Sequence, residues 1–329
     1  MKIAILDDYQ DCVRHLDCFR LLEGHHVKVF TNSAKGVVQL ALRLKDFDAL
    51  VLIRERTTFN RQLLGKLPNL KLISQTGKAS GHIDVATATE NGIAIAEGVG
   101  DPTAPAELTW ALIMASSRKV PQYAANLRDG LWQMASINPE LNTLGTVLKG
   151  RTLGIWGFGR IGRLVAGYGK AFGMNVTVWG SEASRDAARQ LGFQAAESRE
   201  AFFAQADVLS LHLRLNDATR GLVTEDDLAR MKPSALFVNT SRAELLTEGA
   251  LEAALHRGRP GFAAIDVFES EPLPPKTSLL SIPTLLATPH IGYVEKDSYE
   301  LYFRAAFQNV VDFAAGTPKN ILNPDALKR

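Results

Sequence analysis

Residues 151–172, RTLGIWGFGRIGRLVAGYGKAF, carry a glycine-rich turn, Gly157-Phe158-Gly159-Arg160-Ile161-Gly162, between an apolar strand pattern and a helix pattern. In a GxGxxG turn the first glycine, Gly157, permits a tight strand-to-helix turn, Gly159 lets the backbone approach a pyrophosphate, and Gly162 lets the helix pack closely on the strand. The helix N-terminus adds free N–H groups and a positive dipole that favour an anion. The stretch therefore predicts a dinucleotide-binding site.

Outward from this turn, short apolar runs alternate with helix patterns along the chain. Runs buried on both faces are typical of parallel strands, and strands that alternate with helices indicate βαβ units. The sequence therefore predicts an α/β fold with two Rossmann-like modules, each built on a parallel sheet. The predicted strands span residues 3–6, 27–30, 49–53, 72–74, 93–96, 153–156, 176–179, 208–211, 236–239, 263–267 and 285–288. The predicted helices span residues 36–44, 83–90, 106–117, 160–172, 185–191, 224–231, 248–257 and 293–315.

Length, charge and cysteine content exclude several classes of protein. At 329 residues the chain is long for one domain, and its net charge of +2 gives no electrostatic footprint for nucleic acid or an anionic membrane. Cys12 and Cys18 form no CxxC motif and have no second pair, which predicts free thiols and no metal site. No apolar run approaches the ~20 residues of a membrane span or forms a signal peptide. We expect a cytoplasmic protein.

The strand after the glycine turn bears on the choice of dinucleotide. In an NAD-binding protein this strand ends in an acid that binds the ribose 2′-hydroxyl. Here that position is Gly180. Loss of the acid removes repulsion against a 2′-phosphate, and Ser181, Ser184 and Arg185 are able to hydrogen-bond one. The alternative is that Glu182 binds the ribose instead. NAD and NADP both stay open, with a slight preference for NADP.

Candidate catalytic groups follow other predicted strands. Hydride transfer to a ketone leaves an alkoxide that a general acid must protonate, and histidine titrates near neutrality. Among the seven histidines, His290 lies just after a predicted strand, and His212 ends another, where we expect it to border the cofactor. Arg242, Asp266 and Glu271 also come at or after strand ends, although a single such charge is more often a solvated loop residue. Because the carboxyl ends of parallel strands face one crevice, we expect these groups to converge beside the glycine turn.

Four motifs occur in order along the chain: the glycine turn, VNTSR at 238–242, DVFESEP at 266–272 and TPHIG at 288–292. In this combination the chain resembles the D-isomer-specific 2-hydroxyacid dehydrogenases over nearly its whole length. The resemblance implies an NAD(P)-dependent enzyme that transfers a hydride between the cofactor and a D-2-hydroxyacid/2-oxoacid pair. The alternative is a dinucleotide-sensing, corepressor-like protein without significant turnover, but the compact chain has neither the tails nor the peptide groove that such a protein would use.

The resemblance also assigns roles to single residues. It implies that Arg242 binds the carboxylate and carbonyl of the 2-oxo acid, that His290 is the acid/base, and that Glu271 is its charge partner. Asp266 would accept a hydrogen bond from the nicotinamide carboxamide, and the backbone of Arg160-Ile161 would hold the pyrophosphate. The complete set of expected cofactor contacts is Gly157, Gly159, Arg160, Ile161, Gly162, Gly180, Ser181, Arg185, His212, Thr240 and Asp266.

The smaller module would supply the remaining substrate contacts. The loop Gln75-Thr76-Gly77-Lys78 resembles the family's substrate-carboxylate loop, so Thr76, Gly77 and Lys78 are expected there. Lys78 replaces the small residue that is common in the family, and so adds charge for a phosphorylated or dicarboxylate substrate. Arg54 ends a strand of the same module and is expected at the substrate, although a surface salt bridge with Glu55 or Asp84 is the alternative. Tyr293 stands where many members have glycine.

The resemblance further implies a discontinuous domain organisation. Residues 1–105 and 292–329 would form the substrate domain, and residues 106–291 the inserted NAD(P)-binding domain. The predicted helices 106–117 and 293–315 would lie at the two crossovers between them. Family analogy also implies a homodimer, with a small 2-oxo or 2-hydroxy acid as the other partner.

Overall fold

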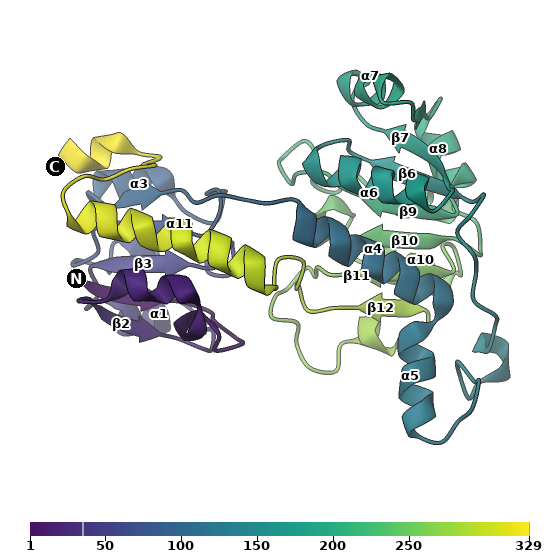
Figure 1. Cartoon of the computed structure of the whole chain (residues 1–329), viewed down its shortest axis with the longest axis horizontal. Helices are drawn as coiled ribbons and strands as arrows, with labels where there is room; N and C mark the ends of the chain where they lie inside the picture. Colours follow the sequence, from purple (N-terminus) through teal and green to yellow (C-terminus); the bar gives the residue numbers. More distant parts are fainter. Residues whose placement is uncertain (35, 329) are drawn as a thin grey trace. The chain divides into compact units, whose positions relative to one another are not determined.

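The computed structural model describes residues 1–34 and 36–328, which form two compact units. One unit combines Met1–Asp101 with Val294–Arg329, and the other is the intervening segment Pro102–Tyr293. The chain therefore passes between the units after Asp101 and after Tyr293. The domain boundaries expected from the sequence lie after residues 105 and 291. Each unit is a sheet flanked by helices (Figure 1).

The discontinuous unit contains a five-stranded parallel sheet in the order β2-β1-β3-β4-β5. Its strands are β1 (Lys2–Ile5), β2 (His26–Val29), β3 (Ala49–Leu52), β4 (Leu72–Gln75) and β5 (Ala94–Ala96). Its helices are η1 (Val13–His15), η2 (Asp17–Leu22), α1 (Val37–Leu44), α2 (Arg61–Leu64), α3 (Val85–Glu90), α11 (Lys296–Ala314) and η6 (Pro324–Lys328). β3 and β4 are buried along their whole length, as expected for strands of a parallel sheet that is covered on both faces. α11 packs against β3, β4 and η2, which ties the carboxyl-terminal part of the chain to this sheet.

The continuous unit contains a seven-stranded parallel sheet in the order β12-β11-β10-β9-β6-β7-β8. Its strands are β6 (Thr152–Trp156), β7 (Asn175–Trp179), β8 (Gln194–Ala195), β9 (Val208–Leu211), β10 (Leu236–Asn239), β11 (Phe262–Ile265) and β12 (Leu285–Ala287). Its helices are α4 (Thr103–Arg118), α5 (Val120–Arg128), η3 (Pro139–Leu141), α6 (Arg160–Ala171), α7 (Glu182–Gln190), α8 (Arg199–Gln205), α9 (Glu225–Ala229), η4 (Ala243–Leu245), α10 (Ala250–His256) and η5 (Ser278–Ser281). α4 packs against α6, β10 and β11, beside the strands whose ends carry the predicted site (Figure 1).

The predicted fold class is confirmed, but several local predictions were wrong. α2, α5, α8 and β8 were not predicted, because they are short or lack a buried face of regular period. The predicted helix 185–191 begins earlier, since the Ser181 hydroxyl caps the helix N-terminus. The predicted helix 293–315 begins only at Lys296, because Glu295 is the N-cap and Tyr293 belongs to the other unit. Among the described residues, no helix has the length and apolarity needed to cross a bilayer.

Candidate active site

The glycine turn leaves β6 and begins α6 as the sequence predicts. Gly157 has a φ of 97°, which favours glycine, and a Cβ there would lie 2.6 Å from a carbonyl oxygen of the loop after β9. A Cβ on Gly162 would overlap the carbonyl oxygen of Gly157. Gly159 is the N-cap of α6, and Arg160 and Ile161 are its first two residues. Around Gly159 no described atom beyond its chain neighbours lies within 4 Å of the Cβ position. The turn thus offers backbone N–H groups and room for a pyrophosphate, which fits a dinucleotide.

Other predicted cofactor residues lie at the end of β7, where Gly180 contributes no acid. The Ser181 hydroxyl caps α7 by accepting from the backbone N–H of Ser184 at 3.3 Å, and the two hydroxyl oxygens are 3.1 Å apart. The Arg185 guanidinium lies 5.0 Å from the centroid of the Trp179 ring. Its Nε is buried without a hydrogen-bond partner among the described residues. This end of β7 therefore gathers a guanidinium and two hydroxyls.

His290 and Glu271 form a hydrogen-bonded pair at the far side of the same sheet edge. Nδ1 of His290 lies 2.6 Å from Oε2 of Glu271, and the backbone N–H of Phe268 donates to Oε1 at 3.0 Å. Burial acts to raise the pKa of Glu271, but the hydrogen bond and charge of His290, together with the Phe268 N–H and the charge of Arg242, hold that pKa below its usual value. Because Nδ1 is held by a carboxylate, Nε2 is the nitrogen that can exchange a proton with a ligand.

Arg242 lies close to this pair in the same unit. It directly precedes η4, and its carbonyl oxygen accepts from Nδ2 of Asn239 at 2.8 Å. Its Nη1 donates to the carbonyl oxygen of Ser241 at 2.7 Å. The positive charge of Arg242 also contributes to the lowered pKa of Glu271. Arg242, Glu271 and His290 thus come after three neighbouring strands, β10, β11 and β12, as the sequence predicts.

The carboxylate of Asp266, at the end of β11, is bonded to the loop that carries His290. Oδ1 accepts from the Thr288 hydroxyl at 2.6 Å and from the backbone N–H of Ile291 at 2.8 Å. Oδ2 accepts from the backbone N–H of Gly292 at 2.8 Å. The residue is 0% exposed, and burial raises the pKa of its carboxyl against these hydrogen bonds. The family resemblance implied a contact between this carboxylate and the nicotinamide carboxamide, and its hydrogen bonds to the loop were not predicted.

His212 and Thr240 are also held by neighbouring side chains. Nε2 of His212 lies 3.0 Å from Oγ of Ser210, and burial lowers the pKa of His212 to about 3. His212 is therefore neutral at neutral pH and unsuited to be the general acid. Oγ1 of Thr240 lies 2.7 Å from Oγ1 of Thr109 on α4.

Tyr293 packs against the imidazole of His290. The two ring centroids are 6.0 Å apart at an interplanar angle of 77°, and Tyr293 is 6% exposed. An edge-to-face contact of this kind restricts the orientation of both rings. His290 itself has a φ of 54°, a left-handed conformation that is uncommon for a residue other than glycine. The catalytic candidate is thus set in an unusual backbone conformation with neighbours on its ring.

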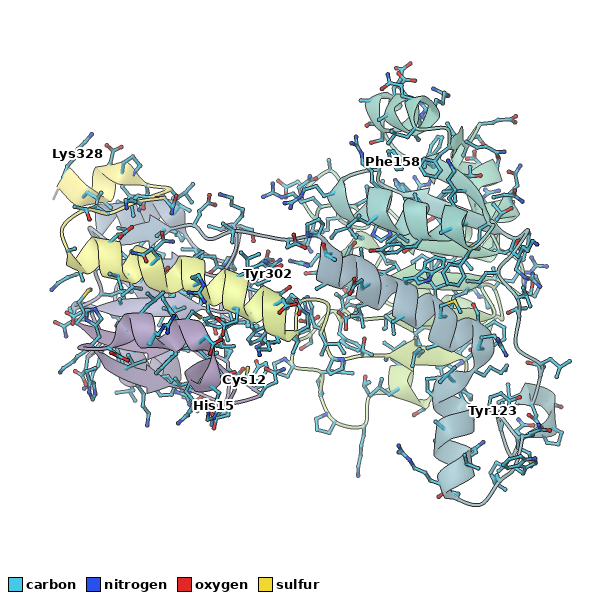
Figure 2. All side chains as sticks on the ribbon, in the orientation of Figure 1. Cys12, His15, Tyr123, Phe158, Tyr302 and Lys328 are labelled. Carbon is cyan, nitrogen blue, oxygen red and sulfur yellow. The ribbon has the colours of Figure 1, made fainter. Side chains whose placement is uncertain are left out.

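The predicted substrate residues Arg54, Thr76 and Gly77 follow or end β3 and β4 in the discontinuous unit. The backbone N–H of Arg54 donates to the Thr76 hydroxyl at 3.1 Å, and Arg54 has a φ of 54°. Its guanidinium carbon lies 5.9 Å from the ring centroid of Tyr302, which is labelled on α11 in Figure 2. A Cβ on Gly77 would lie 2.6 Å from Nη1 of Arg54. Glycine at this position therefore leaves the space that the guanidinium occupies.

Lys78 pairs with the carboxylate of Glu97, a residue of the same unit that was not singled out from the sequence. Nζ of Lys78 lies 2.8 Å from Oε2 of Glu97, and the backbone N–H of Ala79 donates to Oε1 at 3.0 Å. Glu97 directly follows β5, so the rule that found the other candidates, an ionisable residue at the carboxyl end of a parallel strand, would have found it as well. The carboxylate of Glu97 therefore partly neutralises the positive charge that Lys78 brings to this loop.

A dinucleotide-binding glycine turn on the same sheet edge as a histidine–glutamate pair and a guanidinium defines a nicotinamide-dependent oxidoreductase. Residues 110–292 match the family model for the D-isomer specific 2-hydroxyacid dehydrogenase, NAD binding domain. The glyoxylate reductase of Aeropyrum pernix is 37% identical over 293 residues, which cover 88% of this chain and 87% of that protein. The D-3-phosphoglycerate dehydrogenase of Methanocaldococcus jannaschii is 35% identical over 297 residues, but the match covers only 53% of that longer protein. The solved phosphoglycerate oxidoreductase of Vibrio cholerae O395 has a TM-score of 0.93 and 57% identity, covering 96% of this chain and 99% of that one.

The chain belongs to the D-isomer specific 2-hydroxyacid dehydrogenase family. It is an oxidoreductase that transfers a hydride between a nicotinamide cofactor and a D-2-hydroxyacid/2-oxoacid pair. The resemblance stated from the sequence motifs is thereby confirmed. The comparisons support the enzyme and not the corepressor-like alternative.

Proposed function

We propose that Arg242, Glu271 and His290 form the catalytic centre for reduction of a small 2-oxo acid. The observation that carries this proposal is the 2.6 Å contact between His290 and Glu271 on the sheet that also carries the glycine cradle. The bound cofactor supplies the hydride. The planar guanidinium of Arg242 is suited to bind the substrate carboxylate through two hydrogen bonds and to polarise the neighbouring carbonyl.

The pairing of His290 with Glu271 determines how the proton is transferred to the substrate. As negative charge develops on the carbonyl oxygen, the protonated imidazole donates its Nε2 proton to that oxygen. Glu271 fixes the orientation of the ring through Nδ1 and stabilises its cationic form. In the direction of oxidation, neutral His290 accepts the proton of the 2-hydroxyl group through the same nitrogen.

We assign the remaining contacts by unit. Pro102–Tyr293 is the cofactor domain, in which the backbone of Arg160 and Ile161 holds the pyrophosphate. Met1–Asp101 with Val294–Arg329 is the substrate domain, in which Arg54, Thr76 and Gly77 contact the substrate. Lys78 is the weaker substrate candidate because Glu97 already binds its ammonium group.

The function is tested by offering the purified protein a panel of 2-oxo acids with NADH and with NADPH. We expect oxidation of a reduced cofactor with at least one of glyoxylate, hydroxypyruvate, pyruvate and phosphohydroxypyruvate, and a product of D configuration where the product is chiral. A preference for phosphohydroxypyruvate would indicate that the substrate domain recognises a second anion. Tight cofactor binding without turnover of any member of the panel, bulkier 2-oxo acids included, would contradict the proposal.

We further propose a preference for NADP, with Arg185 and the hydroxyls of Ser181 and Ser184 around the 2′-phosphate. The proposal is supported by the absence of an acid at Gly180 and by the buried, unpartnered Nε of Arg185 among the described residues. Glu182, exposed in the first turn of α7, is the residue that would instead favour the ribose hydroxyl of NAD.

Replacing Arg185 by alanine is expected to raise the Kd for NADPH by about tenfold to a hundredfold and to change the Kd for NADH little, because only NADPH loses a charge-assisted hydrogen bond. Titration of nicotinamide fluorescence measures both constants. Arg189→Ala is the matched control, since Arg189 lies on the same helix and pairs with Asp186. Much tighter binding of NADH than NADPH by the unmodified protein would refute the preference.

We also propose that the protein is a homodimer in the cytoplasm. None of the described side chains of α5 is buried within its own unit, and the segment after it exposes Trp132 (73%), Ile137 (77%) and Leu144 (90%). Exposed apolar side chains gathered in one stretch are typical of a protein interface. A reducing compartment is supported by Cys12 and Cys18, which are free thiols.

A further inference from the structure

In the loop 288–292, His290 has a left-handed backbone conformation, which residues other than glycine seldom adopt. His290 has a φ of 54°, and left-handed conformations of this kind persist where the surrounding structure holds them. The loop follows the short strand β12 and is not part of a helix or a strand. Some other part of the unit must therefore fix its backbone.

That part is the carboxylate of Asp266, which bonds to the loop on both sides of His290. On the amino-terminal side it accepts from the Thr288 hydroxyl, and on the carboxyl-terminal side it accepts from the backbone N–H groups of Ile291 and Gly292. A Cβ on Gly292 would lie 3.2 Å from Oδ2, so glycine allows this close approach. Three donors at 2.6–2.8 Å are directed at two buried oxygens. Hydrogen bonds to an ionised acceptor are among the stronger ones in proteins.

We propose that Asp266 is a positioning residue that holds the 288–292 loop so that His290 is set for proton transfer before any ligand binds. The proposal rests on the acid/base role of His290. Asp266 acts on the backbone, whereas Glu271 acts on the ring, so the two carboxylates fix different degrees of freedom of the same side chain. A carboxylate has about four acceptor sites, and the loop donors use three of them.

Replacing Asp266 by asparagine tests the proposal, because an amide cannot accept all three hydrogen bonds. Whichever way the amide is turned, its NH₂ group faces at least one of the loop donors. We expect backbone hydrogen exchange in residues 288–293 of the cofactor-free protein to become about tenfold faster or more, since the loop opens more readily. We also expect kcat to fall about tenfold to a hundredfold through misplacement of the imidazole, with the Kd for NADPH changed by less than about threefold.

Two further variants provide the comparison. Thr288→Val removes one of the three donors and leaves both backbone hydrogen bonds, so it should accelerate exchange of the same loop to a smaller extent. Asp207→Asn alters a carboxylate that accepts from the backbone N–H of Thr152 at 2.8 Å and pairs with Lys232. It should leave exchange in residues 288–293 unchanged. Thr288→Val also keeps the test available if Asp266→Asn does not fold.

The outcomes separate this proposal from the function on which it rests. Unchanged exchange of the loop in cofactor-free Asp266→Asn or, should that variant not fold, in Thr288→Val would overturn the positioning role, as would a loss of activity explained by weaker NADPH binding alone. Such a result would assign Asp266 to the cofactor. The exchange measurement needs no turnover, so it stands even if His290 proves not to be the acid/base.

Discussion

Replacement of His290 by alanine is expected to lower kcat for reduction of a 2-oxo acid by about 10²- to 10⁴-fold, the range that general acid catalysis contributes. The reason is that His290, held through Nδ1 by Glu271, keeps Nε2 for the substrate oxygen, whereas burial keeps His212, which follows β9, neutral. The Kd for the reduced cofactor should remain nearly unchanged, because the glycine turn follows β6, which is separated from β12 by β9, β10 and β11. Stopped-flow turnover and fluorescence titration measure the two quantities.

The control for this experiment is His256→Ala. His256 is an exposed residue at the end of α10 and lies 3.9 Å from Glu252, away from the proposed centre. It should have the turnover of the unmodified enzyme. A His290→Ala enzyme that also keeps near-normal turnover would mean that the acid/base is another group.

Replacement of Arg242 by alanine is expected to lower kcat/KM for the 2-oxo acid by about 10³-fold, through loss of both carboxylate binding and stabilisation of the developing alkoxide. Arg242→Lys should restore only part of the loss, because an ammonium group cannot form the two parallel hydrogen bonds of a guanidinium. Initial rates over a range of 2-oxo acid concentrations measure the effect.

Arg257→Ala serves as the control, since Arg257 is exposed and pairs with Glu225 on the outside of the same unit. Cofactor affinity should be unchanged in all three variants. If Arg242→Lys proved as active as the unmodified enzyme, the guanidinium would not be the carboxylate-binding group.

The architecture was predictable because both faces of each sheet are covered. Strands such as β9 and β10 are mostly apolar and buried along their whole length, and their observed bounds agree to the residue with those predicted from the sequence. The same burial places the polar residues that follow these strands at one edge, so Arg242 and His290 were candidates from their position, and the ordered motifs then implied their roles. β8, a two-residue edge strand, and α5, which buries no described side chain, lack this signal.

The hydrogen bonds and ion pairs among the site residues could not be predicted, because they depend on the backbone conformation of the loops that follow the strands. That Asp266 faces the backbone of Ile291 and Gly292 follows from the left-handed turn at His290, which no residue type in the loop indicates. The pairing of Lys78 with Glu97 similarly joins two strand ends that are distant in sequence. Periodicity and motif spacing report which strand a residue follows, but they do not report which neighbour its side chain meets.

The most direct measurement is a crystal structure of the protein with its reduced cofactor and oxamate, an unreactive analogue of pyruvate. We predict that Nε2 of His290 lies within about 3 Å of the oxamate amide carbonyl oxygen, the distance a proton transfer requires, with both nitrogens of the Arg242 fork on the carboxylate. An oxamate bound beside the nicotinamide with His290 turned away from it, or with Arg242 out of contact, would contradict the proposed catalytic centre.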